Sequence, residues 1–467
     1  MPRARYLAIR PQSRRGPRAN FALAPWPIPV ADYRPVRIPL ESTGKRWLAL
    51  SVALLVAAAM SYQAGRLFLA DRWNSSARPQ DWLRAAALEP ENGEYWHHLG
   101  LYRQWDFEAA DPVLAVQYFQ RAVAVNPRSD RYWMDLASAY ESQGNIPEAS
   151  SGYQKAREVY PMSAEVAWNY GNFLVRQDQI AEGFQEIRQA VRADPLLLPL
   201  AISRCWRAAP DVERLLNEVL PADASAYFQA LDFFASTHQP DPGLAVWNRL
   251  LVLGKPLPLP RSFPFLTELI AQDRAEDATR VWKQALAAAG LPHDDPEGGS
   301  LVWNGGFESD ILNGGFDWRE SPSLSTEMSY DTAIFHSGQR SLRIDFGGGA
   351  NPSFADVVQY VAVSPQTTYH FRAYMRTDSI STESGMRFHI FDPNHSGAVE
   401  LLTPDMTHTQ PWLATDADIT TGPQTHILEI QIRRLPSRLF NNKLSGSVWV
   451  DDVSLVPAAP APGLASP

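Results

Sequence analysis

The feature that most constrains this chain is a run of 19 residues without a charged side chain, from Trp47 to Gly65. A helix rises about 1.5 Å per residue, so the run would span roughly 28 Å, close to the ~30 Å hydrocarbon core of a bilayer. Arg66 interrupts the run, and four apolar residues follow it. We therefore expect a membrane-spanning helix over residues 47–70, with the Arg66 side chain extending to the headgroups. The alternative is a buried helix of a soluble domain.

The segment before this run is basic and rich in proline. Residues 1–46 contain ten Lys and Arg residues against Asp32 and Glu41, a composition that does not support a packed core. Positive charge beside a spanning helix stays on the cytoplasmic side. We therefore expect a disordered cytoplasmic arm over residues 1–46, serving as a topogenic tail or as a contact for a partner or anionic lipid.

This orientation predicts an uncleaved, single-pass protein of the inner (cell) membrane, with its C-terminal bulk periplasmic or extracellular. A cleaved signal peptide is the alternative, because residues 57–59 are small enough for a cleavage site. Without the ten basic and two acidic residues of the arm, the rest of the chain carries 32 basic and 49 acidic residues. That balance excludes nucleic acid as a partner of the exported part, because phosphate backbones require the opposite charge.

From residue 71 the sequence turns helical and repeats. Pro90, Pro127, Pro161 and Pro195 are 37, 34 and 34 residues apart. A period of 34 residues in helical sequence indicates stacked helix pairs, so we expect an α-solenoid over residues 71–290. In the second half of each repeat, a large residue lies between two small ones that let paired helices approach: Ala115, Phe119 and Ala122; Ala149, Tyr153 and Ala156; Gly183, Ile187 and Ala190.

The repeats resemble the tetratricopeptide repeat. Trp96-His97-His98-Leu99-Gly100 and Trp133-Met134-Asp135-Leu136-Ala137 match the Trp-x-x-Leu-Gly signature of that family. The third repeat departs from it, with Ala167 at the Trp position. We assign clear repeats to residues 91–195 and degenerate repeats to 196–290. The resemblance implies a protein partner on the concave face of the solenoid.

Beyond a linker at residues 291–300, the apolar period changes from that of a helix to that of a strand. Eight or nine short strands, the first at Leu301–Trp303, predict an antiparallel β-sandwich over residues 301–457. The Ala- and Pro-rich residues 458–467 predict a disordered tail. The expected fold class is therefore multidomain α + β: a transmembrane helix, an α-solenoid and a C-terminal sandwich.

The β domain resembles carbohydrate-binding modules of the family 4/9/22 type, which are galactose-binding-like jelly rolls. The matching segments are Asn304-Gly305-Gly306-Phe307-Glu308, His336-Ser337-Gly338, Val363-Ser364-Pro365 and Val450-Asp451-Asp452-Val453-Ser454-Leu455. In this family the central strands lie side by side on a concave sheet that binds glycan.

Alternation along three strands selects a candidate glycan site. Side chains that alternate with the expected core residues share the outer face: Arg372, Tyr374, Arg387, His389, Glu429 and Gln431. Aromatic rings stack on sugar faces, and planar polar groups form paired hydrogen bonds with hydroxyls. The alternative is an ordinary solvated face with cross-strand salt bridges. We expect Trp412 to close the core rather than bind ligand.

The same family often holds a structural calcium ion near the joined ends of the domain. Glu308, Asp451 and Asp452 would supply carboxylates, and backbone carbonyls around Ser337 would complete the oxygen shell. The alternative is that these acidic residues accept backbone hydrogen bonds. No other cofactor is expected.

The sequence contains no zinc-binding His-Glu-x-x-His, phosphate-binding loop or Gly-x-Ser-x-Gly nucleophile motif, so we expect no enzyme. The predicted function is a membrane-anchored scaffold with a protein-binding solenoid and a glycan-binding module, acting in bacterial envelope or exopolysaccharide assembly. Two alternatives are a pure protein-interaction adaptor whose sandwich is structural, and an accessory subunit of a glycan-processing enzyme.

Overall fold

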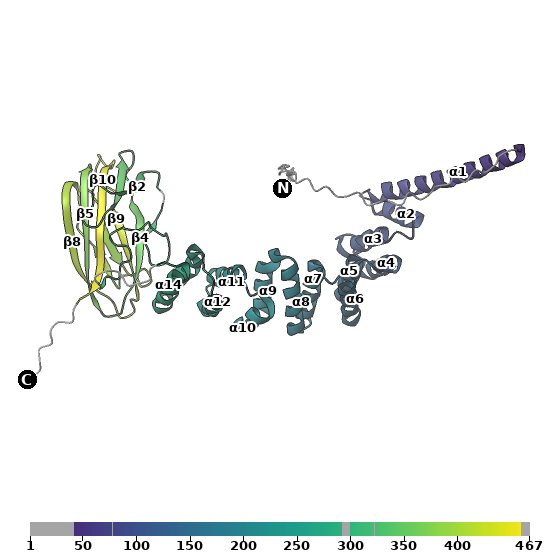
Figure 1. The fold of residues 1–467 in the computed structure, drawn as a ribbon, viewed down its shortest axis with the longest axis horizontal. Coiled ribbons are helices and arrows are strands. Elements are labelled where there is room, and N and C mark those ends of the chain that lie inside the picture. Colours follow the sequence, from purple (N-terminus) through teal and green to yellow (C-terminus); the bar gives the residue numbers. More distant parts are fainter. Residues whose placement is uncertain (1–41, 77, 292–298, 322, 459–467) are drawn as a thin grey trace, which may run out of the picture. The chain divides into compact units, whose positions relative to one another are not determined.

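The computed structural model describes residues 42–76, 78–291, 299–321 and 323–458. The expected arm (1–46), linker (291–300) and tail (458–467) lie almost entirely outside these residues. The described chain forms two compact units, residues 1–89 and 90–467, and each is described by itself. The predicted fold class is confirmed: an N-terminal apolar helix, a helical solenoid and a C-terminal pair of antiparallel sheets (Figure 1).

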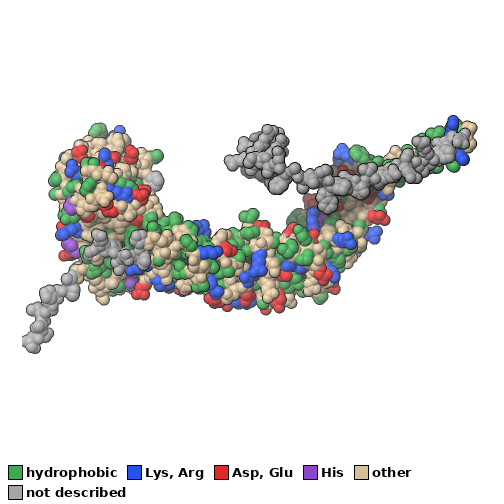
Figure 2. Space-filling view, viewed as in Figure 1, with side chains coloured by type: hydrophobic (Ala, Val, Ile, Leu, Met, Phe, Trp, Pro, Cys, Tyr) green, Lys and Arg blue, Asp and Glu red, His purple; other side chains and the backbone are tan. Residues whose placement is uncertain are grey.

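The first unit consists of helix α1 (Thr43–Asn74) and helix α2 (Pro79–Leu88). Ser42 caps α1 by accepting a hydrogen bond from the Lys45 backbone N–H. Among the described residues α1 is one helix long and apolar enough to cross a membrane. Its uncharged residues are exposed, and where α1 is visible in Figure 2 its surface is mostly hydrophobic.

Helix α2 packs against the C-terminal turns of α1, where Ala70 is buried. An ion pair of 3.6 Å joins Arg66 to Glu89 within this unit. The helix therefore continues beyond the uncharged run into a folded α1–α2 hairpin, and Arg66 lies at the start of that hairpin.

The second unit begins with the solenoid, whose helices follow one another in pairs (Figure 1). The three clear repeats are the pairs α3–α4, α5–α6 and α7–α8, and the degenerate region forms three further pairs. In the first of these, α10 continues into a π-helix at Leu215–Val219. The helices are α3 (Gly93–Trp105), α4 (Pro112–Val125), α5 (Asp130–Ser142), α6 (Ile146–Val159), α7 (Ala164–Arg176), α8 (Ile180–Ala193), α9 (Leu198–Ala208), α10 (Val212–Arg214), α11 (Ala224–Ser236), α12 (Pro240–Val252), α13 (Phe263–Ala271) and α14 (Ala275–Ala289).

The small and large positions of the repeat explain this pairing. Phe119, Tyr153 and Ile187 are buried, as expected of residues that fill the groove between paired helices. A Cβ on Gly100 would lie 2.5 Å from the Phe119 ring. Only a residue without a side chain lets α3 and α4 approach this closely.

The sandwich contains ten strands in two five-stranded antiparallel sheets. Sheet A has the order β1-β4-β9-β6-β7, and sheet B has the order β2-β3-β10-β5-β8. Their inner faces enclose one apolar cluster that includes Phe371, Phe388 and Ile430. The strands are β1 (Arg319–Glu320), β2 (Thr326–Asp331), β3 (Ser341–Gly347), β4 (Phe354–Ala362), β5 (Thr368–Ile380), β6 (Arg387–Phe391), β7 (Glu400–Leu402), β8 (His408–Thr420), β9 (Ile427–Arg434) and β10 (Ser445–Pro457).

The expected first strand at Leu301–Trp303 is wrong, because this segment forms turns. Asn304 and Phe307 both adopt positive φ, so the chain folds back within a few residues. Gly305 lies directly against β10, where its carbonyl accepts a hydrogen bond from the Val453 N–H at 2.9 Å. The segment therefore packs beside the irregular part of β10 between Asp451 and Ser454 and does not extend a sheet.

The sandwich is attached to the last helix pair by direct packing. Phe316 and Ile427, both from the β domain, belong to the apolar core of the solenoid. The turn at Gly314 and Gly315 lies against the rings of Phe263 (α13) and Trp282 (α14). Hydrogen bonds join His426 to Asp273 at 2.6 Å and the Asn394 amide to the Ile270 carbonyl at 3.2 Å. The solenoid and the sandwich therefore share a packed interface.

Candidate ligand-binding site

The six residues of the predicted glycan site lie on two opposite faces of the sandwich. The prediction that their strands lie side by side is wrong, because β5 belongs to sheet B whereas β6 and β9 belong to sheet A. Arg372 and Tyr374 are on the outer face of sheet B. Arg387, His389, Glu429 and Gln431 are on sheet A. Alternation assigned each side chain to the inner or outer side correctly, but it carries no information about which sheet a strand joins.

The sheet A group forms pairs with neighbouring side chains. Arg387 contacts Asp405 at 2.6 Å and His389 contacts Glu400 at 2.8 Å. The Gln431 amide donates to Glu429 at 2.6 Å, and Glu429 is itself buried. This arrangement matches the alternative of an ordinary sheet face with internal polar pairs, so sheet A offers few free groups to a ligand.

The sheet B group forms an aromatic cluster on the outer face. The His336 ring, from the loop between β2 and β3, stacks on Tyr374 with 3.6 Å between ring centroids. Trp412 of β8 meets His336 edge-on at 5.8 Å. Tyr374 pairs across the strands with Ala414, whose small side chain leaves room beside the ring. The expectation that Trp412 closes the core is wrong, because it is half-buried on this outer surface.

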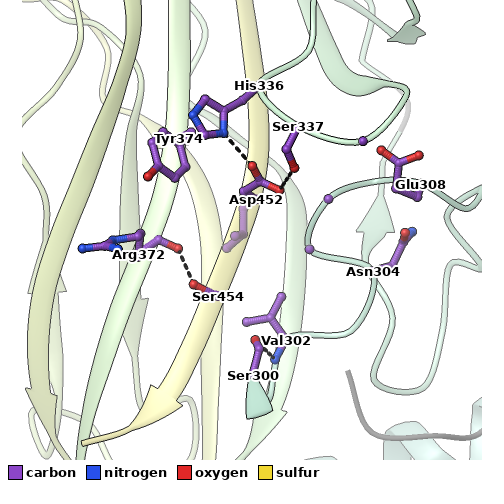
Figure 3. Close-up of a pocket in the computed structure, with 14 residues that line it drawn as sticks. Ser300, Val302, Asn304, Glu308, His336, Ser337, Arg372, Tyr374, Asp452 and Ser454 are labelled. Atoms are coloured by element: carbon purple, nitrogen blue, oxygen red, sulfur yellow. Dashed lines mark hydrogen bonds and ion pairs between the residues drawn. The ribbon is translucent and has the colours of Figure 1, made fainter. Parts of the chain in front are cut away.

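A cavity of about 660 Å³ opens beside this cluster (Figure 3). Tyr374 and Arg372 of β5, Ser454 of β10 and the backbone of Gly305 contribute to its walls. The Arg372 guanidinium donates to Asp416 at 2.5 Å, which holds it in one orientation. The cavity thus combines ring faces with planar polar groups, the combination expected at a carbohydrate or other polar-ligand site.

Sequence reasoning missed two members of this cluster, His336 and Trp412. His336 was noted as part of a fold-matching segment, but the loop that brings it onto Tyr374 could not be derived from alternation. Trp412 could have been found, because Trp412, Ala414 and Asp416 alternate along one strand and Asp416 shares a face with Arg372.

The residues predicted to hold calcium do lie together, at the rim of the same cavity. Asp451 accepts hydrogen bonds from the backbone N–H groups of His336, Ser337 and Asp452. Glu308 accepts from the N–H of Gln339 at 2.8 Å. The Asp452 carboxylate contacts the His336 ring and the Ser337 hydroxyl at 2.6 and 2.7 Å.

These contacts match the alternative in which the acidic side chains accept backbone hydrogen bonds. In the part of the chain that the structure describes, no group of three or more His, Cys, Asp or Glu side chains is arranged to hold a metal ion. The donor set around Glu308, Asp451 and Asp452 therefore does not fit calcium. Its role in the structure is to hold the 336–340 loop against β10.

Asp451 makes the stability of the sandwich depend on pH. Burial raises its pKa to about 6, and the nearby Asp452 adds to the increase. In the unfolded chain the group would ionise near pH 4. Between pH 4 and 6 the unfolded chain has lost a proton that the folded chain keeps, so the free energy of unfolding should fall by roughly 2 kcal/mol as pH rises through this range.

Urea denaturation at pH 4.5 and pH 7 would measure this effect. Asp451→Asn should remove most of the difference attributable to this group, whereas Asp310→Asn, at an exposed side chain, should leave it in place. An unchanged pH dependence in Asp451→Asn would contradict the assignment.

In the solenoid, polar side chains join the first helices of successive pairs. His97 of α3 contacts Asp135 of α5 at 2.6 Å, and the buried His97 ring stacks on Tyr132 with 4.8 Å between centroids. Arg176 of α7 forms two hydrogen bonds with Glu141 of α5, at 2.7 and 2.9 Å. These contacts fix the spacing of the helices whose surfaces form the expected partner site.

Comparisons with known proteins identify the repeats. A family model of the tetratricopeptide repeat matches residues 107–155 and 143–196. No curated protein matches the sequence.

Similar solved structures include the crystal structure of MamA (13% identity, TM-score 0.25, covering 37% of this chain and 84% of that one). YrrB, described as a tetratricopeptide-repeat protein with an unusual peptide-binding site, is 12% identical with a TM-score of 0.25 and covers 46% and 94%. The Arabidopsis OM64 tetratricopeptide domain is 17% identical with a TM-score of 0.23 and covers 25% and 96%.

Proposed function

We propose that this chain is a membrane-anchored, non-catalytic scaffold that binds a partner protein through its solenoid and a glycan through sheet B of its sandwich. The setting that fits these parts is bacterial envelope or exopolysaccharide assembly. The observation that carries the proposal is the row of helix pairs matched by the tetratricopeptide-repeat family. Stacked helix pairs form extended surfaces suited to binding other proteins.

Helix α1 supports the anchoring part of the proposal. Its uncharged residues are exposed, and a contiguous apolar surface of this size requires a cover. The basic residues before it favour a cytoplasmic N-terminus. A periplasm-active reporter fused after residue 89 should be active, and the same reporter fused after residue 46 should be silent. The reverse result would overturn the orientation.

Sheet B supports the glycan-binding part. The cavity beside Tyr374 has stacked rings on one side and oriented polar groups on the other. On a glycan array, the full-length chain in detergent should bind one class of sugar. Tyr374→Ala and Trp412→Ala should each weaken that binding at least tenfold, because each removes a ring that would stack on the sugar.

His389→Ala is the matched control, since His389 lies on the other sheet and is paired with Glu400. It should leave glycan binding unchanged. Equal losses in all three variants, or no sugar bound by the unmodified chain, would contradict the proposed site.

A pure protein-interaction adaptor is the second candidate. It is favoured by the interface at which Phe316 and Ile427 complete the apolar core of the solenoid, because a sandwich in that position covers the end of the last helix pair. Capture of a partner by the full-length chain, unaffected by Tyr374→Ala and Trp412→Ala and without any glycan on the array, would favour this candidate.

A further inference from the structure

The third repeat lacks a side chain that the first two repeats share. Trp96 in α3 and Trp133 in α5 occupy the same repeat position, at which α7 has Ala167. The loss of a whole indole at a repeated position leaves space unless a neighbour fills it. The two repeats that keep the residue show what this position accommodates.

Both tryptophans sit in the same way. The Trp96 indole N–H donates to the Pro90 carbonyl at 2.9 Å, and the Trp133 indole N–H donates to the Pro127 carbonyl at 3.0 Å. Each ring is half-buried at the surface of the solenoid. The guanidinium of Arg121, from the second helix of the first pair, lies 5.9 Å from the centre of the Trp96 ring.

The structure has a cavity of about 180 Å³ at the corresponding place in the third repeat. Ala167 lines it, together with Pro161, which follows Pro127 by one 34-residue repeat, and Gln189, which follows Arg121 by two. An apolar cavity of roughly 150 Å³ in another protein holds a benzene molecule, so a ring system fits a space of this size. The exposed Met162 side chain also lines the cavity.

The remaining walls carry positive charge. Arg157 of α6 and Arg192 of α8 both line the cavity. Arg157 is paired with Glu186 at 2.9 Å, whereas Arg192 is exposed. At the position of Arg157 the neighbouring repeats have the buried apolar residues Val123 and Val191. The third repeat has thus exchanged an apolar wall and a tryptophan for a cationic wall and an open space.

We propose that this cavity receives a tryptophan side chain from a partner protein, with a carboxylate near Arg192. The incoming indole would take the place that Trp96 and Trp133 fill from within the chain, and its N–H would donate to the Pro161 carbonyl. The proposal rests on the protein-binding role proposed above and adds the chemistry of the partner: a tryptophan next to an acidic residue or a chain end.

N-Acetyl-L-tryptophan, which carries an indole and a carboxylate, tests the cavity without any partner. Saturation-transfer NMR with the full-length chain in detergent should show saturable binding that N-acetyl-L-alanine does not compete away. Ala167→Trp should fill the cavity from within, lower the affinity at least tenfold and raise the melting temperature by about 2 °C. Ser151→Trp, at an exposed position of α6, adds an indole outside the cavity and should leave binding unchanged.

Arg192→Glu keeps the test decisive if Ala167→Trp fails to fold. This surface substitution should weaken N-acetyl-L-tryptophan binding at least threefold without changing the melting temperature. Absence of saturable binding to the unmodified chain would overturn the proposal, as would full binding by both Ala167→Trp and Arg192→Glu. Either result would leave partner binding elsewhere on the solenoid untouched, so failure here and failure of the proposed function are distinguishable.

Discussion

Gly315→Ala is expected to lower the free energy of unfolding of the solenoid–sandwich unit by roughly 3 kcal/mol. Gly315 adopts a φ of +60°, which alanine disfavours by about 1 kcal/mol. A Cβ there would also lie 2.3 Å from the ring of Trp282, a buried residue of α14. The ring cannot move without disturbing the last helix pair, so the substitution should open the interface between the solenoid and the sandwich.

Gly254→Ala is the matched control for this prediction. Gly254 has the same φ of +60°, but a Cβ added there would meet no atom within 4 Å, so this variant reports the backbone cost alone. Urea denaturation gives the difference in stability, and limited proteolysis shows whether the junction becomes accessible. Equal losses in the two variants would mean that contact with Trp282 does not hold the domains together.

Arg434→Met is expected to destabilise the sandwich by roughly 4 kcal/mol. Arg434 is fully buried, and burial lowers its pKa. Its guanidinium donates to the carbonyls of Ser384 and Pro352 and to the side chains of Asn351 and Thr382. Methionine replaces the stem of the side chain but leaves these buried acceptors without a donor, which costs more than the lost hydrogen bonds themselves.

Arg433→Met provides the comparison. Arg433 precedes Arg434 in the same strand, is partly exposed and donates to the Phe354 carbonyl at 3.2 Å. Its replacement should cost less than about 1 kcal/mol. Thermal and urea denaturation of the two variants would measure the difference. A loss in Arg434→Met as small as that in Arg433→Met would show that these loops do not depend on the buried guanidinium.

The inner and outer faces of the strands could be predicted from the sequence, but the site could not. Alternation placed Phe371 inward and Tyr374 outward because a strand exposes successive side chains on opposite sides. It did not separate β5 from β6, because both strands obey the same pattern while joining different sheets. The stacking of His336 on Tyr374 depends on a loop held by Asp451, an interaction between residues more than 100 positions apart.

The sequence by itself determined the features that repeat or alternate: the uncharged run of α1, the 34-residue spacing of the helix pairs and the two-residue period of the strands. These patterns arise from short-range geometry, in which each residue's side depends on its neighbours along the chain. Only the tertiary structure decided which strands share a sheet, that Trp412 lies outside the core, and that Phe316 and Ile427 join the solenoid to the sandwich. Those outcomes depend on packing between segments far apart in sequence, and no local period encodes them.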